Sequence, residues 1–224
     1  MKLAVLFTGG KDSTLALIRA MKFHEISCLI TIIPENKFSY MFHSSNIKLT
    51  KYQAKAMNLN HVLFFSKGEK EKEINDLFLA IKQCKKDFNF DGIVSGAIRS
   101  VYQATRIQKV CKKLNLFCFS PLWLIDKEEE INEIEKNEIE AIITQVSSYP
   151  LNENYLGKKI TREIFDDFEK NKINFAGEGG EYETFVTNAK IFKKRIKILK
   201  YEKFFDKSEN FGYVLIKKLK LVKK

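Results

Sequence analysis

The chain contains 224 residues, of which 45% are hydrophobic, and this length and composition suffice for a sizeable buried core. No stretch approaches the roughly 18 consecutive apolar residues of a membrane span, so we expect a cytoplasmic protein with no membrane-embedded part. The formal net charge of +11 is concentrated at one end, because residues 190–224 hold 13 Lys or Arg against 3 Asp or Glu, whereas residues 1–189 carry only +1.

Short apolar runs alternate with helix-length segments along the first half of the chain. The runs are Lys2–Phe7, Ser27–Ile33, His61–Phe65, Gly92–Ser95 and Phe117–Ser120. Between two of them, apolar residues recur at helical spacing at Ile74, Leu77, Phe78 and Ile81. This alternation predicts an α/β domain over residues 1–125, with a parallel sheet and helices on both of its faces.

The alternation stops after the segment Pro121–Asp126. The later segments are a predicted helix at Lys127–Asn137, a strand at Ile139–Val146, a helix at Thr161–Lys172, and, after the loop "NFAGEGGEYETF", two basic strands around Arg195–Phe205 and Tyr213–Val222. We expect these segments to form a smaller α+β domain over residues 126–224.

The stretch "FTGGKDST", residues 7–14, follows the first apolar run and opens the first predicted helix. A helix start presents free backbone N–H groups and the positive end of the helix dipole. Gly9 and Gly10 allow close approach of an anion, Lys11 adds a positive charge and Ser13 a hydroxyl group. The stretch is neither G-x-x-x-x-G-K-[ST] nor G-x-G-x-x-G, which argues against ordinary P-loop and dinucleotide-binding sites.

The sequence "TGGKDS" resembles the [ST]-G-G-x-D-S loop of the PP-loop, or N-type, ATP pyrophosphatases, which cleave ATP between its α and β phosphates. This resemblance implies that ATP is bound by Thr8, Gly9, Gly10, Lys11, Asp12 and Ser13, with Ile32 beside the adenine and Gly96 at a second strand end. Lys11 and Asp12 are expected to take part in catalysis. Asp12 is the candidate ligand for Mg²⁺, which is expected to arrive with ATP.

Four further stretches narrow the resemblance to one family. These are "YMFHSSN" at 40–46, "GAIRSVYQATRIQKVC" at 96–111, "SPLW" at 120–123 and "GEGGEYETFV" at 177–186. Together they closely resemble the diphthine–ammonia ligase family. The resemblance implies that ATP activates the carboxylate of diphthine, a modified histidine of translation elongation factor 2, and that ammonia amidates it with release of AMP and pyrophosphate.

The resemblance also implies roles for individual residues. Because diphthine carries a trimethylammonium group and ammonia travels mostly as ammonium, Glu178, Glu181 and Glu183 are suited to attract these cations, and Tyr182 offers a cation–π face. Glu181 and Glu183 are the candidate proton acceptors. Further substrate contacts are expected from His43, Asn46, Tyr102, Gln103, Arg106 and Thr184.

Two other functions stay open at this point. A PP-loop enzyme that adenylates a tRNA base is favoured by the basic C-terminal segment, but the cysteines Cys28, Cys84, Cys111 and Cys118 include no C-x-x-C pair for sulfur transfer. A nucleotide-binding regulator would keep the loop and need no acidic second site. The basic segment is either a solvated surface or a docking surface for elongation factor 2; nucleic acid is not the expected partner, and the oligomeric state stays undetermined.

Overall fold

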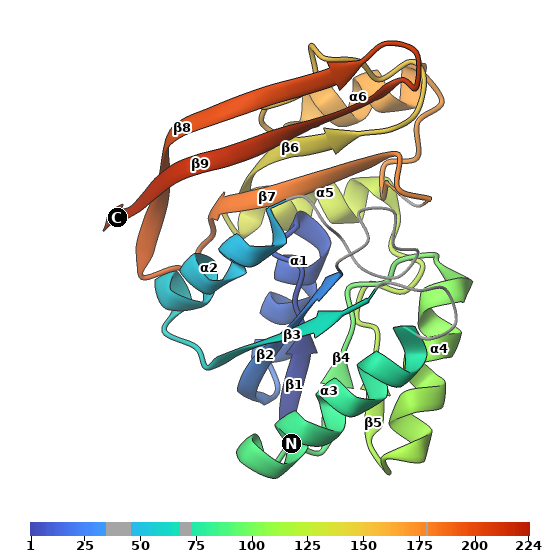
Figure 1. Ribbon diagram of the computed structural model, residues 1–224, viewed down its shortest axis with the longest axis vertical. Helices are drawn as coiled ribbons and strands as arrows, with labels where there is room; N and C mark the ends of the chain where they lie inside the picture. The colour runs from blue at the N-terminus through green and yellow to red at the C-terminus, as the bar shows by residue number, and fades with distance from the viewer. Residues whose placement is uncertain (35–45, 68–72, 178) are drawn as a thin grey trace.

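The computed structural model describes residues 1–34, 46–67, 73–177 and 179–224 (Figure 1). A five-stranded parallel sheet with the order β3-β2-β1-β4-β5 forms the lower half of the molecule in this view. Its strands are β1 (Lys2–Leu6), β2 (Glu25–Pro34), β3 (His61–Ser66), β4 (Gly92–Val94) and β5 (Phe117–Phe119). The predicted strands are therefore confirmed, with shifts of a few residues at their ends.

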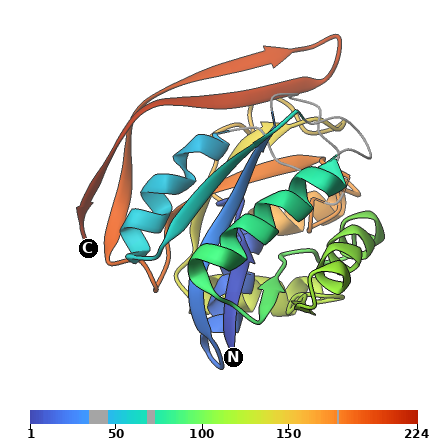
Figure 2. The same cartoon turned by 60° about the horizontal axis from the view of Figure 1, so that its bottom comes forward.

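Helices cover both faces of this sheet, as the alternating pattern predicts (Figure 2). One face packs against α3 (Glu73–Phe88) and α4 (Val101–Lys113), which contribute Leu77 and Val110 to one hydrophobic core. The other face packs against α1 (Lys11–Met21) and α2 (Thr50–Met57), and a short 3-10 turn, η1 (Ile47–Leu49), precedes α2.

A separate four-stranded antiparallel sheet lies above α1 and α2, with the order β7-β6-β9-β8 (Figure 1). Its strands are β6 (Glu140–Val146), β7 (Tyr182–Asn188), β8 (Lys194–Asp206) and β9 (Phe211–Lys223), and the accompanying helices are α5 (Lys127–Lys136) and α6 (Arg162–Lys170). The predicted fold class, a parallel α/β sheet followed by an α+β part, is confirmed.

The strand β7 differs from the expected loop over "NFAGEGGEYETF". Its first residues, Tyr182 to Thr184, pair with Val146, Gln145 and Ile143 of β6. The glycines before Tyr182 favour a loop, but the alternating residues after them find a sheet edge to pair with, and the tertiary pairing decides.

The two sheets meet through α1 and β7. The core that contains Leu15 of α1 also contains Phe185 of β7 and Val214 of β9, so hydrophobic packing continues from one sheet to the other. The division of the chain at residue 125 therefore stays a prediction. No helix in the described part of the chain is both long enough and apolar enough to cross a membrane.

Candidate active site

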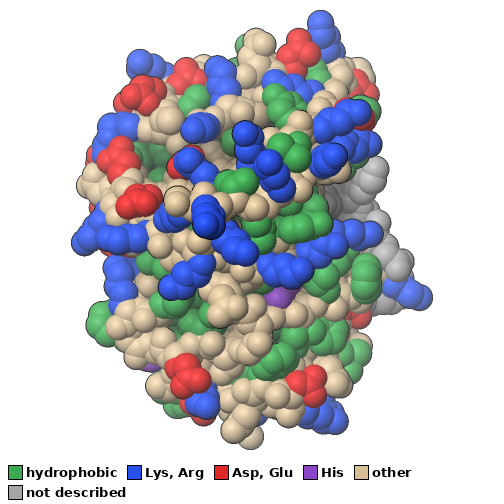
Figure 3. Space-filling view, turned by 90° about the vertical axis from the view of Figure 1, so that its left-hand side faces the viewer, with side chains coloured by type: hydrophobic (Ala, Val, Ile, Leu, Met, Phe, Trp, Pro, Cys, Tyr) green, Lys and Arg blue, Asp and Glu red, His purple; other side chains and the backbone are tan. Residues whose placement is uncertain are grey.

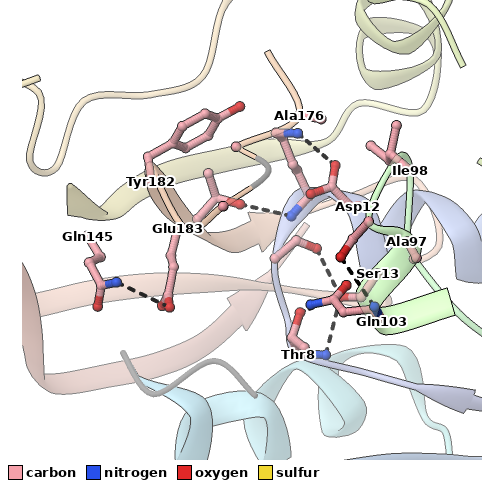
Figure 4. A pocket seen from close by; sticks show the side chains of 18 of the residues that line it. Thr8, Asp12, Ser13, Ala97, Ile98, Gln103, Gln145, Ala176, Tyr182 and Glu183 are labelled. Carbon is pink, nitrogen blue, oxygen red and sulfur yellow. Dashed lines mark hydrogen bonds and ion pairs between the residues drawn. The ribbon is translucent and has the colours of Figure 1, made fainter. Parts of the chain in front are cut away.

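A cavity of about 920 Å³ lies where the parallel strands end and the antiparallel sheet begins. It is lined mainly by the loop at residues 8–13, the loop at 95–103 after β4, residues from 145 to 184 of the second sheet, and the β8–β9 turn. Ile30 and Ile32 of β2 and Leu77 of α3 also contribute to the lining. Figure 4 shows Thr8, Asp12 and Ser13 facing Gln145 and Glu183 across this space. The carboxyl ends of parallel strands are where α/β sheets usually bind ligands.

The loop at residues 8–13 has the form expected of an anion site. Gly10 is the N-terminal cap of α1 in an extended conformation, and as a glycine it has no side chain of its own to bond the first N–H groups. The Ser13 hydroxyl accepts hydrogen bonds from the backbone N–H and the hydroxyl of Thr8, at 3.3 and 3.1 Å. The helix start and both hydroxyl groups therefore converge on the cavity.

Gly9 is held from outside the loop. It adopts φ = +79°, and a Cβ here would collide with the side chain of Gln53. The Gln53 amide is fully buried and donates to the carbonyl oxygens of Gly9 and Val186, both at 2.8 Å. Gln53 thus joins the loop to β7; a glutamine within an ordinary amphipathic helix pattern carries no sequence signal of this role.

Lys11 behaves differently from the prediction. Its side chain is 1% exposed, and its ammonium group lies 2.6 Å from a carboxylate oxygen of Asp12 and 2.6 Å from one of Glu130 in α5. Burial alone would lower the pKa of Lys11, but the two carboxylates raise it well above its ordinary value. The ammonium group therefore neutralises the buried Glu130 carboxylate and the partly exposed Asp12 carboxylate, and the predicted phosphate contact of this side chain does not fit the geometry.

Asp12 is the acidic residue of the first turn of α1, and it lines the cavity with its side chain 29% exposed. Within the described ranges, no three His, Cys, Asp or Glu side chains are grouped so that they could hold a metal ion. One carboxylate beside a phosphate site suits Mg²⁺, which usually takes one or two protein carboxylates in addition to phosphate oxygens. Asp12 fits this limited role.

The loop after β4 packs tightly on the start of α1. A Cβ on Gly96 would lie 2.9 Å from the backbone nitrogen of Ser13, so this glycine is needed for contact with the protein's own helix. Ser100 caps α4 by accepting a hydrogen bond from the Gln103 N–H. Gln103 and Tyr102 line the cavity, as predicted substrate residues should.

The predicted residue Arg106 and the neighbouring Arg99 lie outside the cavity lining. Arg106 is not part of the cavity lining, and its guanidinium group stacks on the Tyr102 ring, 3.4 Å from the ring centre. Arg99 lies over the ring of Phe175 and donates to the Ile125 carbonyl. Neither arginine is among the residues that line the cavity.

The acidic motif, residues 177–186, places its described carboxylates in two different environments. Glu183 lines the cavity and accepts a hydrogen bond from Gln145 at 3.4 Å. Glu181 is outside the lining; one of its oxygens accepts from the Asn174 N–H, and burial raises the pKa of its carboxyl. Since the two carboxylates differ in access, Glu183 fits the predicted contact with a cation and Glu181 does not.

Tyr182 also differs from its predicted role. Its side chain is 4% exposed, its hydroxyl donates to the Phe175 carbonyl, and its ring packs on Phe168 with centroids 4.7 Å apart. The cation nearest to this ring is the Lys11 ammonium, at 5.7 Å from the centroid. Tyr182 does line the cavity, but the packing of its ring on Phe168 and its 4% exposure leave little of the ring face open to a substrate cation.

Asn46 is engaged with the backbone of β9. Its amide donates to the Val214 carbonyl at 2.8 Å and accepts from the Ile216 N–H at 2.9 Å, so a substrate contact by this side chain is not consistent with the structure. The predicted residues His43 and Glu178 lie outside the described residues. Ile32 and Thr184 line the cavity as expected.

The turn between β8 and β9 contributes residues that the sequence reading did not single out. Asp206, Glu209 and Phe211 line the cavity although they belong to the far end of a 13-residue hairpin arm. The sequence "DKSENFG" indicates a turn, but only the strand order places this turn at the cavity.

Comparison with known proteins agrees with this architecture. The diphthamide synthase N-terminal domain matches residues 1–117, and the diphthamide synthase C-terminal domain matches residues 126–222. A rat protein named diphthine–ammonia ligase is 30% identical, with 96% of this chain and 89% of the rat chain covered. The human protein of that name is 31% identical, with 88% and 82% covered.

Two further similarities are weaker, one in its coverage of the relative and the other in identity. A fission yeast diphthine–ammonia ligase is 31% identical over 97% of this chain, which corresponds to 39% of the yeast protein. The solved structure of a predicted tRNA methyltransferase subunit from Methanocaldococcus jannaschii has a TM-score of 0.43 and 16% identity, covering 85% of this chain and 98% of its own. That second likeness is too distant to inform function.

Proposed function

Because this chain belongs to the diphthamide synthase family, we propose that it is an ATP-dependent ligase that forms diphthamide from diphthine and ammonia. The protein substrate in this proposal is translation elongation factor 2, which carries diphthine as a modified histidine. The reaction passes through an acyl-adenylate and releases AMP and pyrophosphate.

In the first half-reaction, a carboxylate oxygen of diphthine attacks the α phosphorus of ATP, and the bond to the β-phosphate oxygen breaks. Backbone N–H groups at the start of α1, together with the hydroxyls of Thr8 and Ser13, bind the departing pyrophosphate. The buried side chain of Ile32 lines the part of the cavity proposed for adenine.

In the second half-reaction, the nitrogen of ammonia attacks the acyl carbon, and AMP leaves with the electrons of the broken C–O bond. Ammonium must lose a proton before this attack, and Glu183 accepts it. Gln145 orients the Glu183 carboxylate through their hydrogen bond. Gln145 is buried, which restricts the positions that this pair can take.

Mg²⁺ fits at Asp12, where it would offset the negative charge of the ATP phosphates. Asp12 itself is held by the Lys11 ammonium at 2.6 Å, so its carboxylate stays directed along the cavity wall. The protein contributes one carboxylate to this site in the proposal.

One contact carries the proposal. The backbone N–H of Lys11, in the phosphate loop, donates to the Thr184 hydroxyl at 3.0 Å, so the ATP motif and the acidic motif form adjacent walls of one cavity. The motifs are 173 residues apart in sequence. This juxtaposition supports adenylation and amidation in a single space.

The direct test is mass spectrometry of diphthine-bearing elongation factor 2 after incubation with the protein, Mg-ATP and ¹⁵N-ammonium. We expect a labelled amide, with one AMP and one pyrophosphate per amide formed. ATP binding without modification of the factor would contradict the proposal and favour a PP-loop enzyme that acts on RNA.

A further inference from the structure

The β8–β9 hairpin pairs lysines with lysines. Lys197 lies directly opposite Lys220, and Lys200 directly opposite Lys218, and all four side chains are exposed. Like charges directly opposite each other in antiparallel strands destabilise the pairing, whereas opposite charges stabilise it. We name these four lysines the basic face.

The basic face is not neutralised by the residues that the structure describes. Two cations of the same hairpin do have partners: Lys217 pairs with Glu202 at 3.0 Å, and Arg195 pairs with Glu140. Within the described ranges, none of the four lysines of the basic face forms an ion pair. Their charges therefore point to solvent, and Figure 3 shows Lys and Arg predominating on the side of the molecule where the hairpin lies.

The same hairpin reaches the candidate active site. Its turn brings Asp206, Glu209 and Phe211 to the cavity, so a protein that inserts one side chain into the cavity must lie at the mouth that this hairpin helps to form. The strands β8 and β9 then extend along the surface for 13 residues each. Lys200 precedes Asp206 by six residues, roughly 20 Å along an extended strand, so a folded protein held at the mouth can cover both the turn and the basic face.

We propose that the basic face is a docking surface for an acidic region of the protein substrate. This inference rests on the proposed function, which requires a protein substrate. The reason lies in the arrangement of charge. Repulsion among the four lysines lowers the stability of the hairpin in the free protein, and an acidic surface bound over them would offset that repulsion. The protein substrate is favoured over RNA because the hairpin that carries the lysines also lines the cavity entered by the substrate side chain.

The test uses a variant that stabilises the hairpin while it removes positive charge. The double substitution Lys197→Glu and Lys218→Glu converts both like-charge pairs into opposite-charge pairs, so thermal unfolding should occur at the same or a higher temperature. The dissociation constant for diphthine-bearing elongation factor 2, measured by fluorescence anisotropy, should rise by roughly 10-fold or more at low salt. The KM for ATP should not change.

The matched control is Lys82→Glu with Lys112→Glu, which reverses two exposed lysines on α3 and α4 and gives the same change in net charge. We expect this control to bind the factor within about 2-fold of wild type, and added salt to reduce the difference between the two double variants. Equal affinity of the two double variants would overturn the proposal. The proposal would also be overturned if the wild-type protein bound RNA and the hairpin variant did not, while both bound the factor equally well. That result would identify nucleic acid as the partner of the basic face.

Failure of the proposed function gives a different result. In that case the wild-type protein forms no amide and no AMP when it is incubated with the factor. The docking surface is tested separately, by the anisotropy measurement of the affinity for the factor. A wild-type protein that catalyses amidation, and whose hairpin variant binds the factor equally well, would overturn the docking surface alone.

Discussion

The Lys11 ammonium lies 2.6 Å from Glu130 Oε1, although the two residues are 119 positions apart in sequence. Their side chains are 1% and 0% exposed, so this is a fully buried ion pair between the phosphate loop and α5. Burial raises the pKa of the Glu130 carboxyl, and the Lys11 ammonium beside it opposes this rise. The pair connects the loop that binds ATP in our proposal with the part of the chain that carries the acidic motif.

The substitution Glu130→Ala should destabilise the fold by about 3–5 kcal/mol, because it leaves a buried ammonium group with only Asp12 beside it. Urea denaturation measures this change. Replacing both members, with Lys11→Met and Glu130→Leu, should recover much of the loss. The control Lys127→Ala removes a lysine of the same helix that pairs with Asp166 and Glu169 of α6, whose side chains are half-exposed or more, and it should cost about 1 kcal/mol or less. Equal destabilisation by Glu130→Ala and Lys127→Ala would contradict the buried pair.

The substitution Gly96→Ala should weaken ATP binding by roughly 10-fold or more, because a methyl group would meet backbone atoms of Ser13 and Asp12 at 2.9–3.0 Å and displace the start of α1. Isothermal titration calorimetry with a non-hydrolysable ATP analogue measures the affinity. Ala97→Gly, which removes a methyl group from the same loop, is the control and should bind the analogue nearly as wild type does. Unchanged affinity in Gly96→Ala would show that the loop relaxes without moving the phosphate site.

Glu183→Gln should lower the rate of amide formation by about 10²-fold or more, the range for loss of a general base, while ATP binding is retained. The rate is measured from amide formation under saturating ATP, at several ammonium concentrations. Glu181→Gln is the matched control, because the Glu181 carboxylate is turned to Asn174 and lies outside the cavity lining. A larger loss of rate in Glu181→Gln than in Glu183→Gln would reverse the assignment.

Stability should decrease in mild acid because of His61. Burial lowers the pKa of His61 to about 4 from its ordinary 6.5, and the ring contacts the Thr31 hydroxyl at 2.9 Å. The unfolded chain therefore binds a proton more readily than the folded protein, so this contribution to stability is present above pH 6.5 and is lost as the pH falls from 6.5 to 4. The loss should amount to about 1–3 kcal/mol.

Chemical denaturation of the wild type and of His61→Gln, at pH 7.5 and at pH 4.5, tests the role of His61. The glutamine variant keeps a polar group at this position but does not titrate, so its stability should fall less between the two pH values. Parallel losses in both proteins would assign the acid sensitivity to other groups.

Local sequence was sufficient for the parallel sheet and for the glycine loop that opens α1. The spacing of apolar residues distinguishes strands from helices, and the glycine pair before Lys11 indicates the start of a helix. Both signals can be read locally because each depends only on residues a few positions away. For the same reason, Ser13, Gln103 and Glu183 could be named as site residues from motifs alone, and all three line the cavity.

Tertiary structure decided which way the side chains of these motifs point. Lys11 and Tyr182 belong to the right motifs, yet both are buried, because Glu130 of α5 and Phe168 of α6 lie against them. Asn46 is bonded to β9, and Gln53 joins Gly9 to β7, through contacts that span more than 40 residues. Composition and spacing thus determined the elements and the anion site, whereas the direction of each polar side chain depended on burial and on partners that only the packed chain brings close.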